Sequence, residues 1–175
     1  KRLYRSQLRG FLKYLYHEQK IIKRDLADLL VGPPIYAKAK PPKFLRSQEV
    51  QKLFASLTLS TPRSIRTYAM VHLAYTMALR PVEISRIILN DISFSEKILT
   101  MPERKGDRPI TLPIPEKTMK AIAVYILHVR IKTQHRHLFM TCQRPYRPLS
   151  SGSVCVEIWS AMKEAGLSSS AYWLR

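Results

Sequence analysis

The residues from Tyr68 to Leu79 include almost no polar side chain, and His72 and Thr76 are the exceptions. A segment that is apolar on all sides predicts a helix buried all round. Arg80 follows directly, and then comes Pro81. Proline disfavours helical backbone at the residue before it and suits the first turn of a new helix. The pattern therefore predicts a buried helix that runs through this segment and places Arg80 at a junction between two helices.

Apolar positions elsewhere in the chain predict further helices and a few strands. The helices are expected over residues 1–17, 23–30 and 81–88, and from Ser47, Thr61, Pro115 and Ser150 or Ser151 onward. Short apolar runs predict strands near residues 92, 98–101, 110–112 and 138–140, and the pair Gly106–Asp107 suits a tight hairpin turn between two of them. We expect a mainly α protein with a small antiparallel β-hairpin or sheet, that is, an α+β fold.

Prolines and a glycine interrupt periodic structure over residues 32–44, which reads as a basic, proline-rich linker. Residues 1–31 hold two predicted helices, which cannot close a core alone, so they are expected to be the C-terminal part of a small helical domain. Residues 45–175 form the larger domain. The chain begins with a lysine and stops at Arg175, so we interpret it as an excised part of a longer protein.

The charge of the chain narrows the class of partner. Thirty Lys and Arg residues against 12 Asp and Glu give a net charge of +18 at pH 7. A polyanion must balance such a charge, and double-stranded nucleic acid is the favoured one. An anionic membrane surface is the competing partner, but it favours one basic amphipathic helix, whereas here the basic residues are spread along the chain. No apolar run is long enough to predict a membrane span.

The two cysteines predict neither a disulfide framework nor a zinc site, and we expect no metal and no cofactor. This cysteine usage fits a reducing, cytoplasmic compartment. The residues expected to contact a nucleic-acid backbone lie on the first helix, in the linker, on the hairpin and in a proline-rich loop: Arg2, Arg5, Arg9, Lys38, Lys40, Lys43, Arg104, Arg108, Arg144 and Arg147.

Three basic residues are candidates for chemistry on a phosphate. Arg80 follows the buried helix, Lys105 lies at the predicted hairpin tip, and Arg175 follows Tyr172 by three residues. Glu83 is close enough in sequence to orient Arg80. A structural interpretation of Arg80 also stands, because an arginine at the end of a helix stabilises the last carbonyl groups. Few glycines are present, and none forms a phosphate-cradling loop, so side chains would have to bind a phosphate.

These motifs resemble those of the tyrosine recombinases, the phage-integrase family. The segment LAYTMALRPVEIS resembles the first arginine box, ERKGDRPITLPI resembles the hairpin that carries the catalytic lysine, and LFMTCQRPYRPLSSGSV resembles the segment before the second arginine box. YWLR stands where that box has His-x-x-Arg. The resemblance covers nearly the whole chain, and it implies a helical core-binding domain followed by a catalytic domain.

The resemblance implies site-specific DNA recombination or integration through a 3′-phosphotyrosine intermediate. Arg80 and Arg175 would neutralise the scissile phosphate, Lys105 would protonate the leaving 5′-oxygen, and Glu83 would orient Arg80. Arginine suits this task because its planar fork meets two phosphate oxygens. Members of the family act as a homotetramer on DNA and need no metal. A bacterial or phage origin is implied.

The chain departs from the family in two ways. Tyr172 stands at the histidine of the second arginine box, and tyrosine is a weaker acid and base at neutral pH. The nucleophilic tyrosine of the family would lie beyond Arg175, so the chain is expected to bind DNA without cleaving it. The alternatives are a catalytically inactive DNA-binding regulator on the same scaffold and a basic helical module without phosphoryl chemistry.

Overall fold

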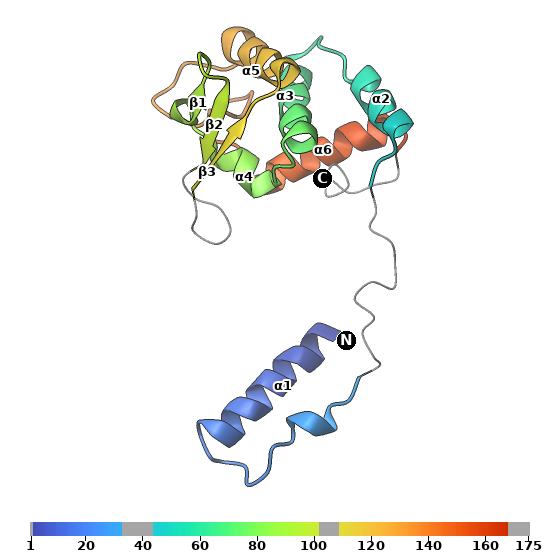
Figure 1. Ribbon diagram of the computed structural model, residues 1–175, viewed down its shortest axis with the longest axis vertical. Coiled ribbons are helices and arrows are strands. Elements are labelled where there is room, and N and C mark those ends of the chain that lie inside the picture. The colour runs from blue at the N-terminus through green and yellow to red at the C-terminus, as the bar shows by residue number, and fades with distance from the viewer. Residues whose placement is uncertain (1, 33–43, 102–108, 168–175) are drawn as a thin grey trace. The chain divides into compact units, whose positions relative to one another are not determined.

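The computed structural model describes residues 2–32, 44–101 and 109–167, and the chain divides into two compact units, Lys1–Pro42 and Lys43–Arg175 (Figure 1). The helices are α1 (Arg2–His17), α2 (Ser47–Ser56), α3 (Pro62–Thr76), α4 (Pro81–Arg86), α5 (Glu116–His128) and α6 (Ser151–Glu164). The strands are β1 (Ile92–Ser93), β2 (Ile98–Met101) and β3 (Ile110–Pro113), and two 3₁₀ turns are η1 (Ala27–Leu29) and η2 (Leu89–Asp91).

The first unit consists of α1, a connecting loop and η1. Helix α1 contacts η1. Large apolar side chains on α1 are nevertheless exposed, namely Leu3, Tyr4, Leu8, Phe11 and Tyr14. The helix predicted over residues 23–30 is wrong, because only the 3₁₀ turn forms there. Asp25 Oδ1 accepts the backbone N–H of Ala27 at 2.8 Å, and such a local bond competes with helix formation.

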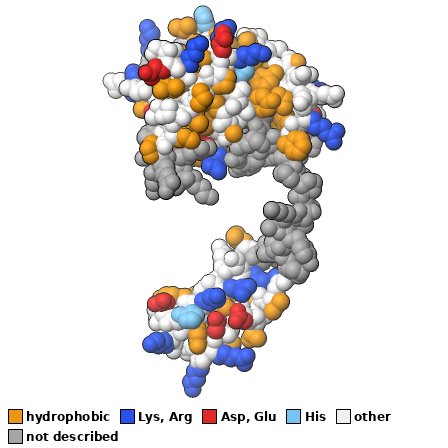
Figure 2. All heavy atoms as spheres, in the orientation of Figure 1, with side chains coloured by type: hydrophobic (Ala, Val, Ile, Leu, Met, Phe, Trp, Pro, Cys, Tyr) orange, Lys and Arg blue, Asp and Glu red, His pale blue; other side chains and the backbone are white. Residues whose placement is uncertain are grey.

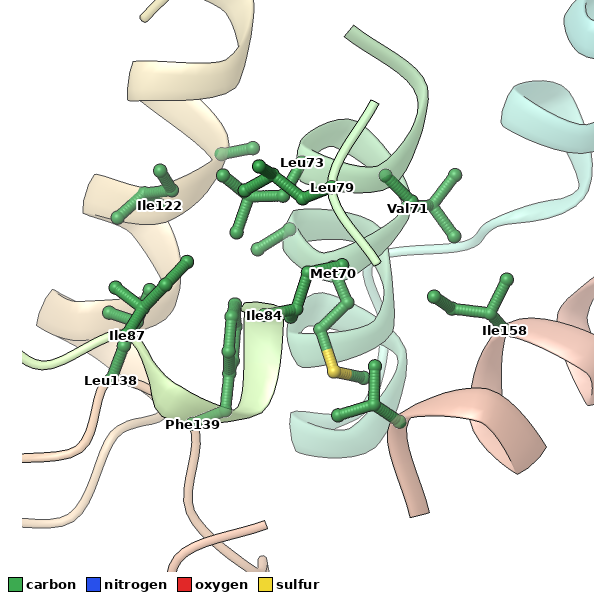
Figure 3. Packing of buried hydrophobic residues seen from close by; sticks show 14 of the residues in the cluster. Met70, Val71, Leu73, Leu79, Ile84, Ile87, Ile122, Leu138, Phe139 and Ile158 are labelled. Carbon is green, nitrogen blue, oxygen red and sulfur yellow. The ribbon is translucent and has the colours of Figure 1, made fainter. Parts of the chain in front are cut away.

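The second unit is built around α3. In Figure 1, α3 lies between α5 and α2, with α6 and α4 below it, and it contacts α4, α5 and α6. Figure 3 shows Met70 and Val71 of α3 on the side of Ile158 of α6, and Ile122 of α5 on the opposite side. Helices α2, α3, α4, α5 and α6 share one apolar core with the loop that carries Leu138 and Phe139.

The three strands form one antiparallel sheet in the order β1-β2-β3. Ile92 pairs with Leu99, and at the other end of β2 Met101 pairs with Ile110. The predicted antiparallel pairing and the predicted α+β class are confirmed, whereas the turn predicted at Gly106–Asp107 lies outside the described residues. Residues 138–140 form no strand of their own. Leu138 and its neighbours are buried, and isolated bridges join this segment to residues 88 and 148.

Apolar character predicted which residues are buried better than it predicted helix ends. The buried helix was expected to reach Leu79, but α3 ends at Thr76. Leu79 is nevertheless 1% exposed. Apolar character does not always mean burial, since Leu127 and Trp159 are 77% and 47% exposed. In the described residues, no helix is long and apolar enough to cross a membrane.

Candidate active site

The turn between α3 and α4 holds Arg80 in place. Thr76 Oγ1 donates to the carbonyl oxygen of His72 at 2.8 Å and lies 2.8 Å from Thr118 Oγ1, which fixes the end of α3 against α5. Ala78 then adopts a left-handed backbone with a φ of 52°, which reverses the chain. Leu79 anchors in the core. As a result, Arg80 has an extended backbone directly before α4, and the turn that carries it is anchored in the core.

Glu83 orients Arg80 through two hydrogen bonds. Its Oε2 accepts the backbone N–H of Arg80 at 2.7 Å, and its Oε1 accepts a guanidinium N–H at 3.2 Å. The Glu83 side chain is 5% exposed and that of Arg80 is 41% exposed. A buried carboxylate thus fixes a guanidinium whose outer part reaches solvent. The prediction that Glu83 contacts Arg80 is confirmed at the level of geometry.

The carboxylate of Glu83 also argues against the alternative in which Arg80 only caps α3. Arg80 lies in front of the N-terminus of α4, where a cation is disfavoured by the helix dipole. Glu83 at the third helical position neutralises that end of α4. The same carboxylate also pairs with the Arg80 guanidinium, so Glu83 compensates the positive charge that stands before α4.

The other residues of the predicted phosphate site lie outside the described residues. Lys105 belongs to the segment that joins the paired residues Met101 and Ile110, and Tyr172 and Arg175 follow the last described residue, Leu167. Their assembly with Arg80 stays a prediction. The same holds for five predicted DNA contacts in the linker and the hairpin segment, Lys38, Lys40, Lys43, Arg104 and Arg108, and for the side chain of Arg2.

The predicted DNA contacts in the described residues fall into two groups. On α1, Arg9 lies 3.6 Å from a carboxylate oxygen of Asp28. Arg5 packs against Gly32, where an added Cβ would lie 1.9 Å from a guanidinium nitrogen. Both arginines therefore have contacts within their own unit. Figure 2 shows Lys and Arg side chains spread over the visible face of both units, among apolar ones.

The second group lies in the loop between α5 and α6. Thr141 N–H donates to the carbonyl oxygen of Arg147 at 2.9 Å, and Arg147 N–H donates to Thr141 Oγ1 at 3.0 Å. This pair of bonds closes the base of the loop. Arg144 and Arg147 are exposed, and the guanidinium of Arg144 lies 6.0 Å from the centre of the Tyr146 ring. Two cations are thus presented on an ordered loop.

Sequence reasoning missed a buried ion pair that holds α6 to α3. Arg66 and Glu157 are 3% and 8% exposed. The Arg66 guanidinium donates to both carboxylate oxygens of Glu157 and to the carbonyl oxygen of Met140. Thr67 Oγ1 donates to Glu157 Oε2 at 3.1 Å. This pair therefore fixes α6 to α3 and to the loop that carries Met140.

Two described groups that could act as nucleophiles are poorly prepared for it. Tyr125 is buried, and its hydroxyl accepts the backbone N–H of Met140 at 3.1 Å. Burial raises the pKa of the Tyr125 hydroxyl. Burial also raises the pKa of the Cys142 thiol. Both groups therefore stay protonated at neutral pH and serve the structure around the loop that carries the exposed arginines.

The chain is similar in sequence to proteins of one known family. The Phage integrase family matches residues 43–174. Tyrosine recombinase XerC of Bacillus subtilis is 30% identical over 77% of the chain, and tyrosine recombinase XerC 2 of Ralstonia nicotianae is 25% identical over 93% of it. The chain spans 45% and 46% of the lengths of these two relatives.

Solved structures share the fold. The XerH site-specific recombinase, bound to a palindromic difH substrate, aligns with 98% of the chain and 52% of its own length, at a TM-score of 0.76 and 17% identity. A lambda integrase dimer bound to a COC′ core site aligns with 99% of the chain and 60% of its own length, at a TM-score of 0.70 and 19% identity. At these identities the likeness concerns the fold.

Proposed function

The chain belongs to the phage integrase family, and from that premise we propose that its full-length parent is a site-specific tyrosine recombinase that cuts and rejoins double-stranded DNA. The observation that carries the proposal is the Arg80–Glu83 pair, a half-exposed guanidinium fixed by a buried carboxylate. Such a fixed donor stabilises negative charge that develops on a phosphate without having to reorganise during the reaction.

The proposed reaction is a phosphoryl transfer in two halves. A tyrosine hydroxyl of the parent attacks the scissile phosphorus, a phosphotyrosine bond forms at the 3′ end, and the bond to the 5′-oxygen breaks. Arg80 and Arg175 hold the non-bridging oxygens, and Lys105 gives a proton to the leaving 5′-oxygen. Tyr172 donates a hydrogen bond to the phosphate. The reverse attack by a 5′-hydroxyl of another strand rejoins the DNA and frees the tyrosine.

The proposed domain roles follow the same premise. Residues 1–31 belong to a core-binding domain, residues 32–44 link it to the catalytic domain, and residues 45–175 carry the catalytic domain up to the second arginine box. The nucleophilic tyrosine then lies downstream of Arg175 in the parent. The chain of 175 residues therefore binds duplex DNA without cleaving it, and the parent assembles as a tetramer on its site.

The test is covalent trapping on a nicked suicide duplex that carries the recombination site of the parent. We expect the full-length parent to form a protein–DNA adduct that withstands denaturing electrophoresis. Arg80→Ala should reduce the rate of adduct formation by about 10²–10³-fold and leave DNA binding nearly unchanged. Arg63→Ala, which removes an exposed arginine of the same unit, is the matched control and should keep the parental rate.

Two results would redirect the proposal. If the full-length parent binds its site but never forms an adduct, the parent is a DNA-binding regulator on this scaffold, which the tyrosine at position 172 would favour. If Arg80→Ala lowers DNA affinity and adduct rate by the same factor, Arg80 contributes to binding alone. Tyr172→His is the complementary variant, since restoring the family residue should raise the adduct rate of an active parent.

A further inference from the structure

A groove opens in the second unit between α2, α3 and the start of α5, and Arg80 is not among the residues that line it. Its volume is about 640 Å³, which is the size of a site for a small molecule. Its lining residues are Val50, Gln51, Phe54, Tyr68, His72, Tyr75, Thr76, Pro115, Glu116 and Lys117. Aromatic rings from two helices thus face polar groups at the beginning of a third.

His72 is the polar residue that the fold leaves unexplained. It is 5% exposed, and neither ring nitrogen has a hydrogen-bond partner among the described residues. Its ring lies 4.7 Å from the centre of the Phe54 ring and 4.6 Å from that of Tyr68. Leaving a buried polar group unpaired is unfavourable. His72 lines the groove, but both of its ring nitrogens are inaccessible, so a ligand in the groove can supply a partner only once the ring rotates.

The N-terminus of α5 is the second polar group of the groove. Pro115 precedes the helix, and no described side chain caps its first turn. The first N–H groups of a helix need acceptors and attract negative charge. Glu116 does not supply it, because its carboxylate pairs with Lys120 Nζ at 2.6 Å one turn along the same helix. Lys117 adds a positive charge at the rim, so the groove is complementary to an anion.

We propose that this groove is a binding site for a small aromatic carboxylate. The carboxylate lies at the first turn of α5 beside Lys117, and the aromatic body lies against Phe54, Tyr68 and Tyr75. His72 contributes a hydrogen bond after a small rotation of its ring. This inference goes beyond recombination and does not depend on it, because none of these residues belongs to the proposed phosphate site.

The size and chemistry favour a small molecule over a protein segment. The apolar wall consists of rings from two helices, and the positive charge of Lys117 belongs to a third helix. That arrangement fixes the orientation of a flat molecule with one charged end. An extended or helical segment would require a longer apolar surface, for which the groove residues provide no continuation at the Lys117 end.

The test uses the chain of 175 residues and the probe indole-3-acetate. Binding is followed by isothermal titration and by the side-chain NMR signals of His72, Tyr68 and Phe54. We expect saturable binding and shifts confined to these signals and the first turn of α5. The neutral isostere indole-3-acetamide should bind about tenfold more weakly, since it loses the charge-assisted contact.

Two variants separate the parts of the site. Lys117→Gln should weaken indole-3-acetate about threefold to tenfold and leave the amide unaffected. Lys132→Gln removes an exposed lysine beyond the other end of α5 and should leave both affinities unchanged. Lys117 is exposed, so its replacement should not disturb folding, which thermal unfolding of each variant checks. His72→Phe should weaken both probes if it folds.

Three outcomes would overturn the proposal. The first is the absence of shifts at His72 and Tyr68 at millimolar probe. The second is equal binding of the acid and the amide, which would mean that the charge is not recognised. The third is that only a blocked dipeptide ending in a phenylalanine carboxylate binds, in which case the groove is a docking site for a protein C-terminus.

Discussion

At the level of single residues, the contact between Arg66 and Glu157 should be the most costly to break. Both side chains are nearly inaccessible to solvent, so removing one partner leaves a buried charge without compensation. We expect Arg66→Met to lower the free energy of unfolding by about 3–5 kcal/mol, measured by urea denaturation. Arg63→Met is the control. Arg63 lies 3.9 Å from the same carboxylate but is 62% exposed, so its loss should cost less than about 1 kcal/mol.

His72 should make stability depend on pH. Burial first, and then repulsion from Lys117, lowers the pKa of His72 below its ordinary value of 6.5. The unfolded chain therefore binds a proton there before the folded one does, and the free energy of unfolding falls as the pH drops below 6.5. Above that pH the contribution is fully present.

The measurement is urea denaturation at several pH values below and above the ordinary pKa of histidine. His72→Gln should flatten the loss of stability on the acid side. His135→Gln, which replaces an exposed histidine, is the matched control. A His72→Gln profile that still falls as steeply as the parental one would mean that other groups cause the acid sensitivity.

At the level of elements, the turn from α3 to α4 stores conformational strain at Ala78. A φ of 52° is costly for alanine and readily adopted by glycine. Ala78 is exposed, so shortening its side chain loses little packing. We expect Ala78→Gly to raise the free energy of unfolding by about 0.5–1 kcal/mol. Ala78→Val should lower it, and urea denaturation would contradict the argument if both variants moved in the same direction.

The same turn shows which properties of the helices could be predicted from the sequence. Apolar pattern reports burial, so it predicted correctly that Leu79 is buried, but it could not show that the helix ends three residues earlier. The helix ends because residue 78 has a left-handed backbone. An alanine in the sequence does not signal that conformation. The buried partners Arg66 and Glu157 were missed because they are 91 residues apart, and no local period connects them.

The sequence could predict the part of the candidate site whose residues are close together along the chain. Arg80 and Glu83 were predicted as a pair because Pro81 fixes the start of α4 and a carboxylate at the third helical position reaches back to the residue before the helix. Lys105, Tyr172 and Arg175 belong to segments outside the described residues, so their convergence on Arg80 remains a prediction. The covalent trapping experiment tests the contributions of Arg80 and Tyr172 to that site.

At the level of the whole molecule, the net charge of +18 predicts DNA binding that depends strongly on salt. Each phosphate contact makes the slope of log K against log salt concentration more negative by about 0.9. The paired replacement Arg144→Gln and Arg147→Gln removes two exposed cations from an ordered loop. If both contact phosphates, the slope should become shallower by about two units, measured by fluorescence anisotropy with a duplex over a range of salt concentrations.

A charge-matched control decides between contact and bulk charge. Lys132→Gln together with Lys163→Gln lowers the net charge by the same amount, but neither lysine is among the residues assigned to DNA. If this variant reduces the slope as much as the arginine pair does, DNA is held by the overall field and not by the loop. If only the arginine pair reduces it, the loop between α5 and α6 contacts DNA directly. The slope depends on the number of phosphates that the protein neutralises and not on the total charge of the protein.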